Sequence, residues 1–392
     1  MNFKFLEDYM EYWVDKFSPG CCIVVYKDGK QVFRYQAGYS DIENKTRITG
    51  NELFNMYSCT KVATVTAGMQ LYERGLFLLD EPLCEFIPDF KDVTVRDNEG
   101  NIKKAEKYIT MRHLFTMTAG FSYIRDDAFF EKAKELGGGK ITTNSYARAL
   151  AYRPLGFEPG AQWEYSLCHD VLGAVIEVIS GKKFEDYMRE NIFEPLGMTR
   201  TCFHLPEEKY DLMAPQYSYE TEGEKDIVRL QMSNSKQKGC IVKVDKHNKL
   251  SEYVSELVDS GGGGIISNPD DYIKLVAALA NWGTGVNGER ILSKGAVELM
   301  RTNQLGDSQL KDFRWPDLQG YGYGLGVRTL MNPALNGNMG SIGEFGWSGA
   351  AGSSTLADPE LNLAMVFSQH ILNPRESCYC PRLRNVLYAC VK

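Results

Sequence analysis

The sequence is poor in the features that metal sites and membrane spans need. Only five histidines occur in 392 residues, and they are scattered, at positions 113, 169, 204, 247 and 370. The ten cysteines include no Cys-x-x-Cys pair. We therefore expect no zinc site, no other metal and no cofactor. No stretch stays apolar for the roughly 18 residues that a membrane span requires, so we expect no membrane partner.

The chain also lacks an excess of positive charge and a recognisable export signal. Its formal net charge of -7 argues against a nucleic-acid partner. The first residues carry Glu7 and Asp8 and have no continuous apolar core, unlike a signal peptide. Without an export signal, reduced thiols are the default for the cysteines, and we expect a cytoplasmic location.

What is present is the composition of an ordinary globular protein. Hydrophobic residues make up 43% of the chain and charged residues 24%, which is typical of a packed core with a solvated surface. The length suffices for about two domains. We find no internal repeat and no low-complexity linker, and the sequence carries no signal for an oligomeric state.

The predicted strands gather at the two ends of the chain. Alternation and turn residues predict strands over 21–26, 31–35, 321–330, 345–357 and 361–368. Asp28-Gly29 is a strong hairpin signal between the first two strands. Helical spacing of apolar residues predicts helices near the N-terminus (Leu6, Tyr9, Trp13, Phe17) and over 58–75, 111–117, 171–179, 269–282 and 381–390.

This order of elements predicts an α+β fold. One antiparallel sheet would be built from both chain ends and flanked by the first and last helices. We assign residues 1–60 and 255–392 to this sheet domain, and residues 61–254 to an inserted, mostly helical domain. The helical domain would include a polar, weakly periodic excursion at about 205–254. A catalytic cleft is expected between the two parts.

The stretch Ser58-Cys59-Thr60-Lys61 carries the main functional hypothesis. Serine is a favoured N-cap, and the apolar spacing that follows predicts a helix with one buried side. Lys61 would share a helix face with Ser58. A lysine removed from water holds its proton less tightly, and a helix N-terminus favours an oxyanion. We therefore predict that Ser58 is a nucleophile and Lys61 its base.

Ser-x-x-Lys is weak as a pattern by itself. It occurs five times, starting at residues 58, 180, 233, 235 and 308, and only Ser58 is followed by a predicted buried helix. The alternative is an ordinary capping serine beside a solvated lysine. Cys59 is a less favoured nucleophile, because it lies one helical position around from Ser58. Gly346-x-Ser348-x-Ala350 is only a near miss for a nucleophile elbow, because its fifth residue is alanine.

Two further stretches are candidates for the same site. Tyr165 comes just before the helix predicted at 171–179 and would act as an acid or base in the cleft. The alternative is aromatic core packing. The small residues of Trp347-Ser348-Gly349-Ala350 would let a substrate reach backbone N–H groups. The alternative there is close packing of a strand.

Together these stretches resemble the serine β-lactamase and penicillin-binding-protein superfamily. The closest branch is the class C β-lactamase-like one, which includes family VIII esterases, D-aminopeptidases and acyltransferases. The similarity covers roughly residues 20–370 and includes Ile109–Leu114, Pro159-Gly160, Tyr165-Ser166, Asp170–Gly173, Pro195–Met198 and Gly261–Gly264. It implies the sheet-plus-helices fold and an acyl-enzyme at Ser58.

The resemblance also implies roles for individual residues. Lys61 and Tyr165 would share proton transfer, and the backbone N–H groups of Ser58 and Ala350 would form an oxyanion hole. Substrate contacts would come from Leu167, Trp347, Ser348 and Gly349.

Two residues depart from the lactamase pattern. Leu167 stands where lactamases have asparagine, and Trp347 stands where they have lysine or histidine. Both departures resemble the esterase and acyltransferase branch. We therefore expect a serine hydrolase, either an esterase or an acyltransferase, whose partner is a small-molecule ester, amide or acyl donor. The alternatives are a peptidase or amidase for short or D-configured peptides, a weak β-lactamase, and a catalytically silent binding protein on this fold.

Overall fold

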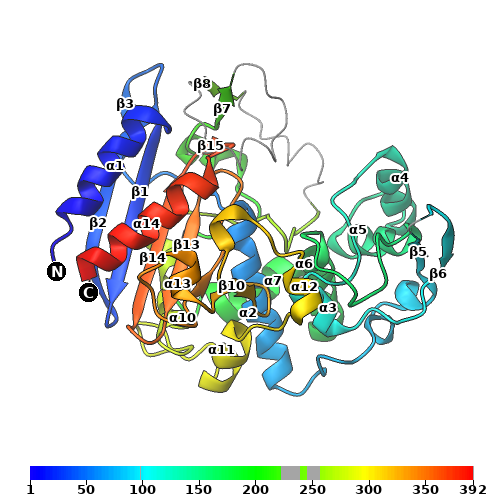
Figure 1. Cartoon of the computed structure of the whole chain (residues 1–392). Coiled ribbons are helices and arrows are strands. Elements are labelled where there is room, and N and C mark those ends of the chain that lie inside the picture. The colour runs from blue at the N-terminus through cyan, green and yellow to red at the C-terminus, as the bar shows by residue number, and fades with distance from the viewer. Residues whose placement is uncertain (98, 222–238, 245–256, 392) are drawn as a thin grey trace.

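An eight-stranded antiparallel sheet is the centre of the fold. The computed structural model describes residues 1–97, 99–221, 239–244 and 257–391. The strand order is β10-β11-β12-β13-β14-β1-β2-β3. The strands are β1 (Gly20–Lys27), β2 (Lys30–Asp41), β3 (Thr46–Arg47), β10 (Tyr321–Tyr323), β11 (Arg328–Leu330), β12 (Phe345–Gly346), β13 (Ser354–Asp358) and β14 (Leu363–Gln369). The sheet therefore combines both chain ends, as predicted (Figure 1).

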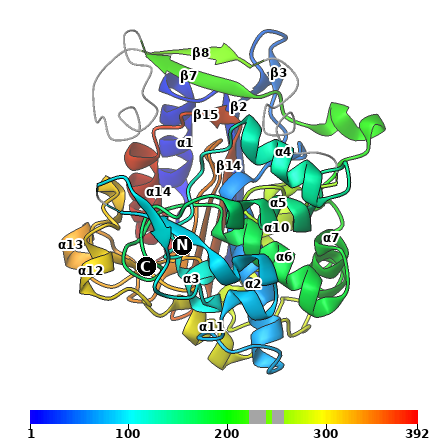
Figure 2. The same ribbon diagram turned by 90° about the vertical axis from the view of Figure 1, so that its right-hand side faces the viewer.

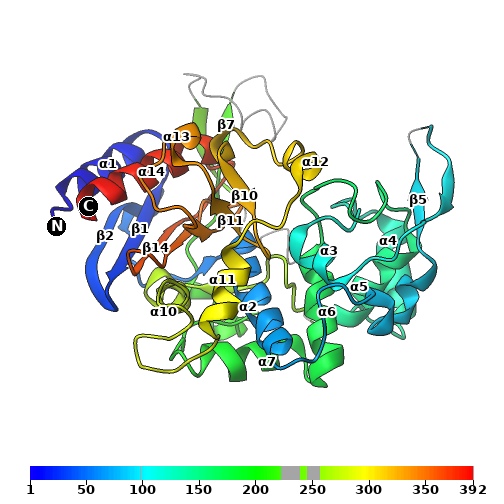
Figure 3. The ribbon, with the colours of Figure 1, turned by 60° about the horizontal axis from the view of Figure 1, so that its bottom comes forward.

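Helices cover both faces of this sheet. α1 (Lys4–Lys16) and α14 (Glu376–Val391) pack side by side on one face, where Figures 1 and 3 also show the two termini close together. α10 (Pro269–Ala280) packs on β1, β13 and β14. The layer formed by α1 and α14 buries Leu6, Met10, Trp13, Leu383 and Leu387 against the sheet. This arrangement confirms the predicted α+β class with flanking terminal helices.

Two predicted strands are in fact hairpins. The chain reverses between β10 and β11, where Gly326 takes a φ of 77°. It reverses again between β12 and β13, through a turn over residues 349–352 in which Gly352 has a φ of 88°. Glycine adopts such left-handed angles without a steric penalty. The predictions of single strands over 321–330 and 345–357 are therefore wrong, whereas the turn at Asp28 and Gly29 is confirmed.

α2 (Thr60–Glu73) follows a short 3₁₀ turn, Tyr57–Cys59, and runs through the middle of the molecule. Every residue from 60 to 71 is buried, so the prediction of one buried side is wrong. The helix contacts α6 (Cys168–Ser180), α7 (Phe184–Met188) and α11 (Lys294–Arg301), and these neighbours leave it no solvent face. A helix enclosed in this way holds its first turn rigidly.

The remaining elements are short. They are α3 (Met111–Thr116), α4 (Asp127–Leu136), α5 (Thr143–Ala149), α12 (Asp307–Leu310), α13 (Pro333–Asn336), β4 (Phe54–Asn55), β5 (Thr94–Arg96), β6 (Ile102–Lys104) and β9 (Ile266–Ser267). No helix in the part of the chain described here is both long and apolar enough to cross a membrane.

The excursion at 205–254 is only partly described. It contains β7 (Tyr217–Thr221) and β8 (Gly239–Lys243), and β7 pairs in parallel with β15 (Ile371–Leu372) (Figure 2). Residues 222–238 and 245–256 lie outside the described part. The excursion is thus tied to the C-terminal end of the chain, while the division into two domains stays a prediction.

Candidate active site

Ser58 lies in a turn with unusual backbone geometry. The preceding residue, Tyr57, has a φ of 45°, which is uncommon for a residue with a side chain. Ser58 is half-buried and does not cap α2, because Cys59 at the cap position is already helical, with φ -59° and ψ -27°. The prediction of a capping serine is therefore wrong. Strain of this kind costs about 1–3 kcal/mol and is common at functional sites.

Lys61 is completely buried in the first turn of α2. Its ammonium donates to Ser58 Oγ at 3.2 Å, to Tyr123 OH at 3.1 Å and to the Gly262 carbonyl at 2.6 Å. These contacts use all three donors of the group. Across the described residues, no carboxylate oxygen lies within 4.0 Å of Nζ. The lysine is thus held by neutral oxygens beside the serine.

Two tyrosines face this lysine. The Tyr165 ring lies 4.7 Å from Lys61 Nζ, and its hydroxyl accepts a hydrogen bond from Trp347 Nε1 at 3.1 Å. Tyr123 lies beside Tyr165, with ring centroids 5.6 Å apart. Enclosure of its hydroxyl, and then Tyr165, raise the pKa of Tyr123 well above its usual value. No sequence pattern indicated Tyr123, because it lies in an aperiodic loop before α4.

The glycine run at 261–264 supports the lysine from the other side. Asp170 Oδ1 accepts the Ser260 hydroxyl at 2.6 Å and the Gly262 N–H at 3.2 Å. A Cβ on Gly262 would lie 2.3 Å from Asp170 Oδ2, so a larger residue there would have to displace the Asp170 carboxylate. Burial, and then the Lys61 charge, lower the pKa of His169 to about 3, which keeps this neighbour neutral. Asp170 therefore positions the carbonyl that Lys61 contacts.

The turn after β12 lies directly against the Ser58 turn. A Cβ on Gly349 would lie 2.3 Å from the Met56 carbonyl oxygen. Ala350 is exposed at the tip of this turn. In the described part of the chain, the N–H groups of Ser58 and Ala350 both lack a protein acceptor. The structure thus places two unbonded N–H groups on neighbouring turns, one of them on the serine itself.

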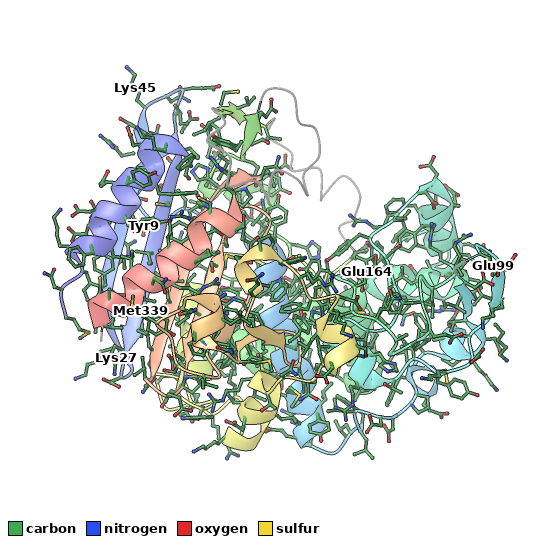
Figure 4. All side chains as sticks on the ribbon, viewed as in Figure 1. Tyr9, Lys27, Lys45, Glu99, Glu164 and Met339 are labelled. Atoms are coloured by element: carbon green, nitrogen blue, oxygen red, sulfur yellow. The ribbon has the colours of Figure 1, made fainter. Side chains whose placement is uncertain are left out.

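The predicted substrate-contact residues expose little surface. Leu167 and Trp347 are each 2% exposed, and Leu167 belongs to the main hydrophobic core. Ser348 donates to Glu376 at the start of α14. Glu164, which precedes Tyr165, lies where the segment carrying α12 meets the helical region (Figure 4). Substrate contact by Leu167, Trp347, Ser348 and Gly349 stays a prediction, with little surface open on the first two.

We expect Gly349→Ala to lower activity without unfolding the protein. The added methyl would push the 347–350 segment away from the Met56 backbone, and a shift of about 1 Å near reacting groups can cost about 10²-fold in rate. Gly295→Ala is the matched control, because its Cβ meets nothing within 4 Å. Ester turnover and circular dichroism check both variants. Wild-type turnover in Gly349→Ala would show that this contact does not matter.

One group elsewhere has the composition of a metal site. Ligand atoms of Glu185, His204 and Asp259 lie within 4.8 Å of one another. His204 Nε2 and Asp259 Oδ1 are 2.8 Å apart, and Asp259 Oδ2 accepts the Glu185 N–H at 2.8 Å. These hydrogen bonds account for the arrangement, and we assign no metal to it. The expectation of a metal-free protein stays a prediction.

Two cavities lie away from Ser58. Two cavities of about 610 Å³ each are lined by Arg112, His113 and Gln304 in one case and by Gln70, Glu73 and Asn191 in the other. Neither is lined by Ser58, Lys61 or Tyr165.

The sequence and the fold were compared with known proteins, and several relatives and one family match. Esterase EstB of Burkholderia gladioli is 28% identical over 363 residues, covering 88% of this chain and 84% of the relative. Acyltransferase mokF of Monascus pilosus is 28% identical over 248 residues, covering 62% of this chain and 55% of the relative. EstCE1, described as a hydrolase with promiscuous acyltransferase activity, shares the fold, with a TM-score of 0.76, 24% identity and 98% coverage of both chains. The Beta-lactamase family model matches residues 4–388. The chain therefore belongs to the Beta-lactamase family, which confirms the superfamily that its motifs indicated.

Proposed function

We propose that this protein is a serine hydrolase or acyltransferase that forms an acyl-enzyme at Ser58. The observation that carries the proposal is the 3.2 Å contact between Ser58 Oγ and the Nζ of the completely buried Lys61. In the acylation step, Lys61 acts in its amine form: the 3.2 Å hydrogen bond reverses its direction, and Nζ accepts the Ser58 proton while Ser58 Oγ bonds to the substrate carbonyl carbon. The N–H groups of Ser58 and Ala350 receive the oxyanion, which collapses as the leaving group departs with a proton.

A tyrosine hydroxyl gives its proton to the leaving group and takes the proton that Lys61 accepted from Ser58. Tyr165 is the residue that the family pattern indicates, and its ring covers Lys61 Nζ. Tyr123 contacts the ammonium directly at 3.1 Å and is the second candidate. Water or another small acceptor then attacks the acyl group, with the same groups acting in reverse.

Neutral esters are the proposed substrates. The relatives include a protein named an esterase and one named an acyltransferase. Beside Tyr165 stand the rings of Trp315 and Trp347, with centroids 5.3 and 5.6 Å away. Trp347 replaces the cation that binds a β-lactam carboxylate in the lactamase pattern. A lost hydrogen bond to a charged group weakens recognition by about 1.5–3 kcal/mol.

The wild-type protein should therefore prefer an ester to a β-lactam. We expect kcat/KM for nitrophenyl butyrate to exceed that for nitrocefin by at least roughly tenfold, which corresponds to about 1.4 kcal/mol. Faster turnover of nitrocefin would contradict the proposed substrate class. Trp347→Lys is a poor test of this preference, because it would bury a charge where the tryptophan is 2% exposed.

The alternatives predict different outcomes in two simple assays. A catalytically silent binding protein would not react with a fluorophosphonate, whereas the proposed enzyme is labelled once. A peptidase or amidase for short or D-configured peptides would cleave nitroanilides as well as nitrophenyl esters. Adding an alcohol to the ester assay separates hydrolysis from acyl transfer, because transfer yields a new ester.

A further inference from the structure

We propose that Glu376 is a positioning residue for the turn that carries the Ala350 N–H. It acts through Ser348, and so sets where that N–H lies relative to Ser58. The inference rests on the proposed acyl-enzyme chemistry and deepens it. The sequence did not indicate Glu376, because the last helix was predicted to begin at Pro381 and in fact begins at Glu376.

The first turn of α14 holds this segment at two points. Ser348 Oγ donates to Glu376 Oε1, and Tyr379 OH donates to the Gly352 carbonyl at 3.0 Å. Residues three apart share a helix face, so both contacts come from the same side of α14. They hold the two ends of the 348–352 turn. Ala350 lies between these two ends. Its methyl side chain cannot form a hydrogen bond, so the contacts at the two ends position its backbone.

Ser348 lies between two residues that contact the candidate site. The residue before it, Trp347, donates to Tyr165 OH, and the residue after it, Gly349, touches the Met56 backbone beside Ser58. Side chains alternate along an extended segment, so Ser348 points to the opposite side from Trp347, toward α14. The hydrogen bond between Ser348 and Glu376 therefore helps to set where the segment lies relative to Ser58.

Charged groups surround Glu376 but none forms an ion pair with it among the described residues. Arg328 on β11 bonds to Glu344 at 2.8 Å, and Arg384 on α14 lies 3.8 Å from Asp317. Burial, and then the Asp317 charge, raise the pKa of Glu376 to about 8, against the opposing effect of the two arginines.

The remaining titratable neighbours stay neutral. Burial raises the pKa of Cys59 and of Tyr379 well above their usual values, and that of Cys380 to about 12. Among these groups around Ser348, Glu376 is therefore the one whose charge changes near pH 8. Protonated, it holds Ser348 without placing a negative charge behind the oxyanion site. Ionised, it opposes the oxyanion.

The test compares pH profiles of kcat/KM for nitrophenyl butyrate between pH 6 and pH 10. Glu376→Gln keeps an acceptor for Ser348 but cannot ionise. We expect it to stay within about threefold of the wild type at pH 6.5. Above pH 8 the wild type should lose an additional roughly tenfold that the variant does not lose, the order expected for a unit charge inside a protein. Superimposable profiles would overturn the inference. Glu99→Gln, on an exposed turn, is the matched control.

A double-mutant cycle tests the route through Ser348. Ser348→Ala and Glu376→Ala should each lower kcat about tenfold with KM nearly unchanged, and the double variant should be no worse than either one. Residues that act through one contact are non-additive in this way. Additive losses would contradict a route through Ser348.

Thermal unfolding gives a second readout for the protonation state. The unfolded carboxyl ionises near its ordinary pKa of 4.5, whereas the folded one ionises near 8. Between these values the wild type loses stability as pH rises, because ionisation favours the unfolded state. The Tm of Glu376→Gln minus that of the wild type should therefore increase from pH 5 to pH 8. A constant difference would contradict a carboxyl held neutral.

Failure of this inference is distinguishable from failure of the proposed function. If the wild type is acylated on Ser58 but Glu376→Gln shows the wild-type profile, only the role of Glu376 is wrong. If the wild type is never acylated, the proposed function itself is wrong.

Discussion

Ser58→Ala should abolish both ester turnover and fluorophosphonate labelling. The variant loses the atom that bonds to the acyl carbon. Among the described residues, the other hydroxyl that contacts Lys61 Nζ is that of Tyr123, and its pKa lies well above the usual value, so we expect no attack from it. Cys59 does not substitute, because it is completely buried and its pKa is well above the usual value. We expect the folded structure to persist, because the serine is half-buried and does not cap α2.

Ser180→Ala is the matched control for this variant. Ser180 also opens a Ser-x-x-Lys sequence, but it ends α6, and the hydrogen bond of its hydroxyl within the described residues is one accepted from the N–H of Lys182, at 3.3 Å. Its turnover should equal that of the wild type. Wild-type turnover in Ser58→Ala would refute the nucleophile assignment. Complete restoration of activity through Cys59 would refute it equally.

Tyr165→Phe should lower kcat by about 10²- to 10⁴-fold, the range expected when a general acid or base is lost. The ring remains over Lys61, so the cation–π contact between the ring and the Lys61 side chain is preserved. The removed hydroxyl also accepts from Trp347 Nε1, and an unpaired buried donor costs about 1–3 kcal/mol. Stability should therefore fall measurably, which the sequence did not predict. Thermal unfolding and pre-steady-state kinetics separate the two effects.

Comparison with Tyr123→Phe shows which of the two tyrosines transfers the proton to the leaving group. If Tyr165 transfers it, Tyr123→Phe removes one hydrogen bond from Lys61 and costs only about tenfold. A larger loss in Tyr123→Phe than in Tyr165→Phe would move the assignment to Tyr123. A near-normal rate in Tyr165→Phe would leave that ring a packing role only.

The sequence predicted the parts of the site that lie on regular elements. Ser58 and Lys61 are three residues apart on one short stretch, so helical spacing alone brought them together. The sheet from both chain ends followed from alternation and from the Asp28-Gly29 turn. The turns within 321–330 and 345–357 were not predicted, because their small residues fit a strand pattern as well as a reversal.

Tyr123 and Glu376 were beyond sequence reasoning for a different reason. Tyr123 reaches Lys61 from an aperiodic loop, across 62 positions of the chain. Glu376 begins a helix that contains Pro381, and proline ordinarily marks a helix start. Burial of Tyr379 and Cys380 stabilises the turn before Pro381, so the helix begins earlier in the chain, at Glu376. Tertiary packing, rather than local pattern, decides both positions.

Rapid quenching of the wild-type protein with nitrophenyl butyrate, followed by intact mass and peptide mapping, shows whether an acyl-enzyme forms on Ser58. We expect a transient gain of one butyryl group, located on Ser58, that forms and decays at rates compatible with turnover. The Ser58→Ala protein should gain none. Turnover of the ester without any acylated intermediate, or a butyryl group mapped to a residue other than Ser58, would contradict the proposed acyl-enzyme on Ser58.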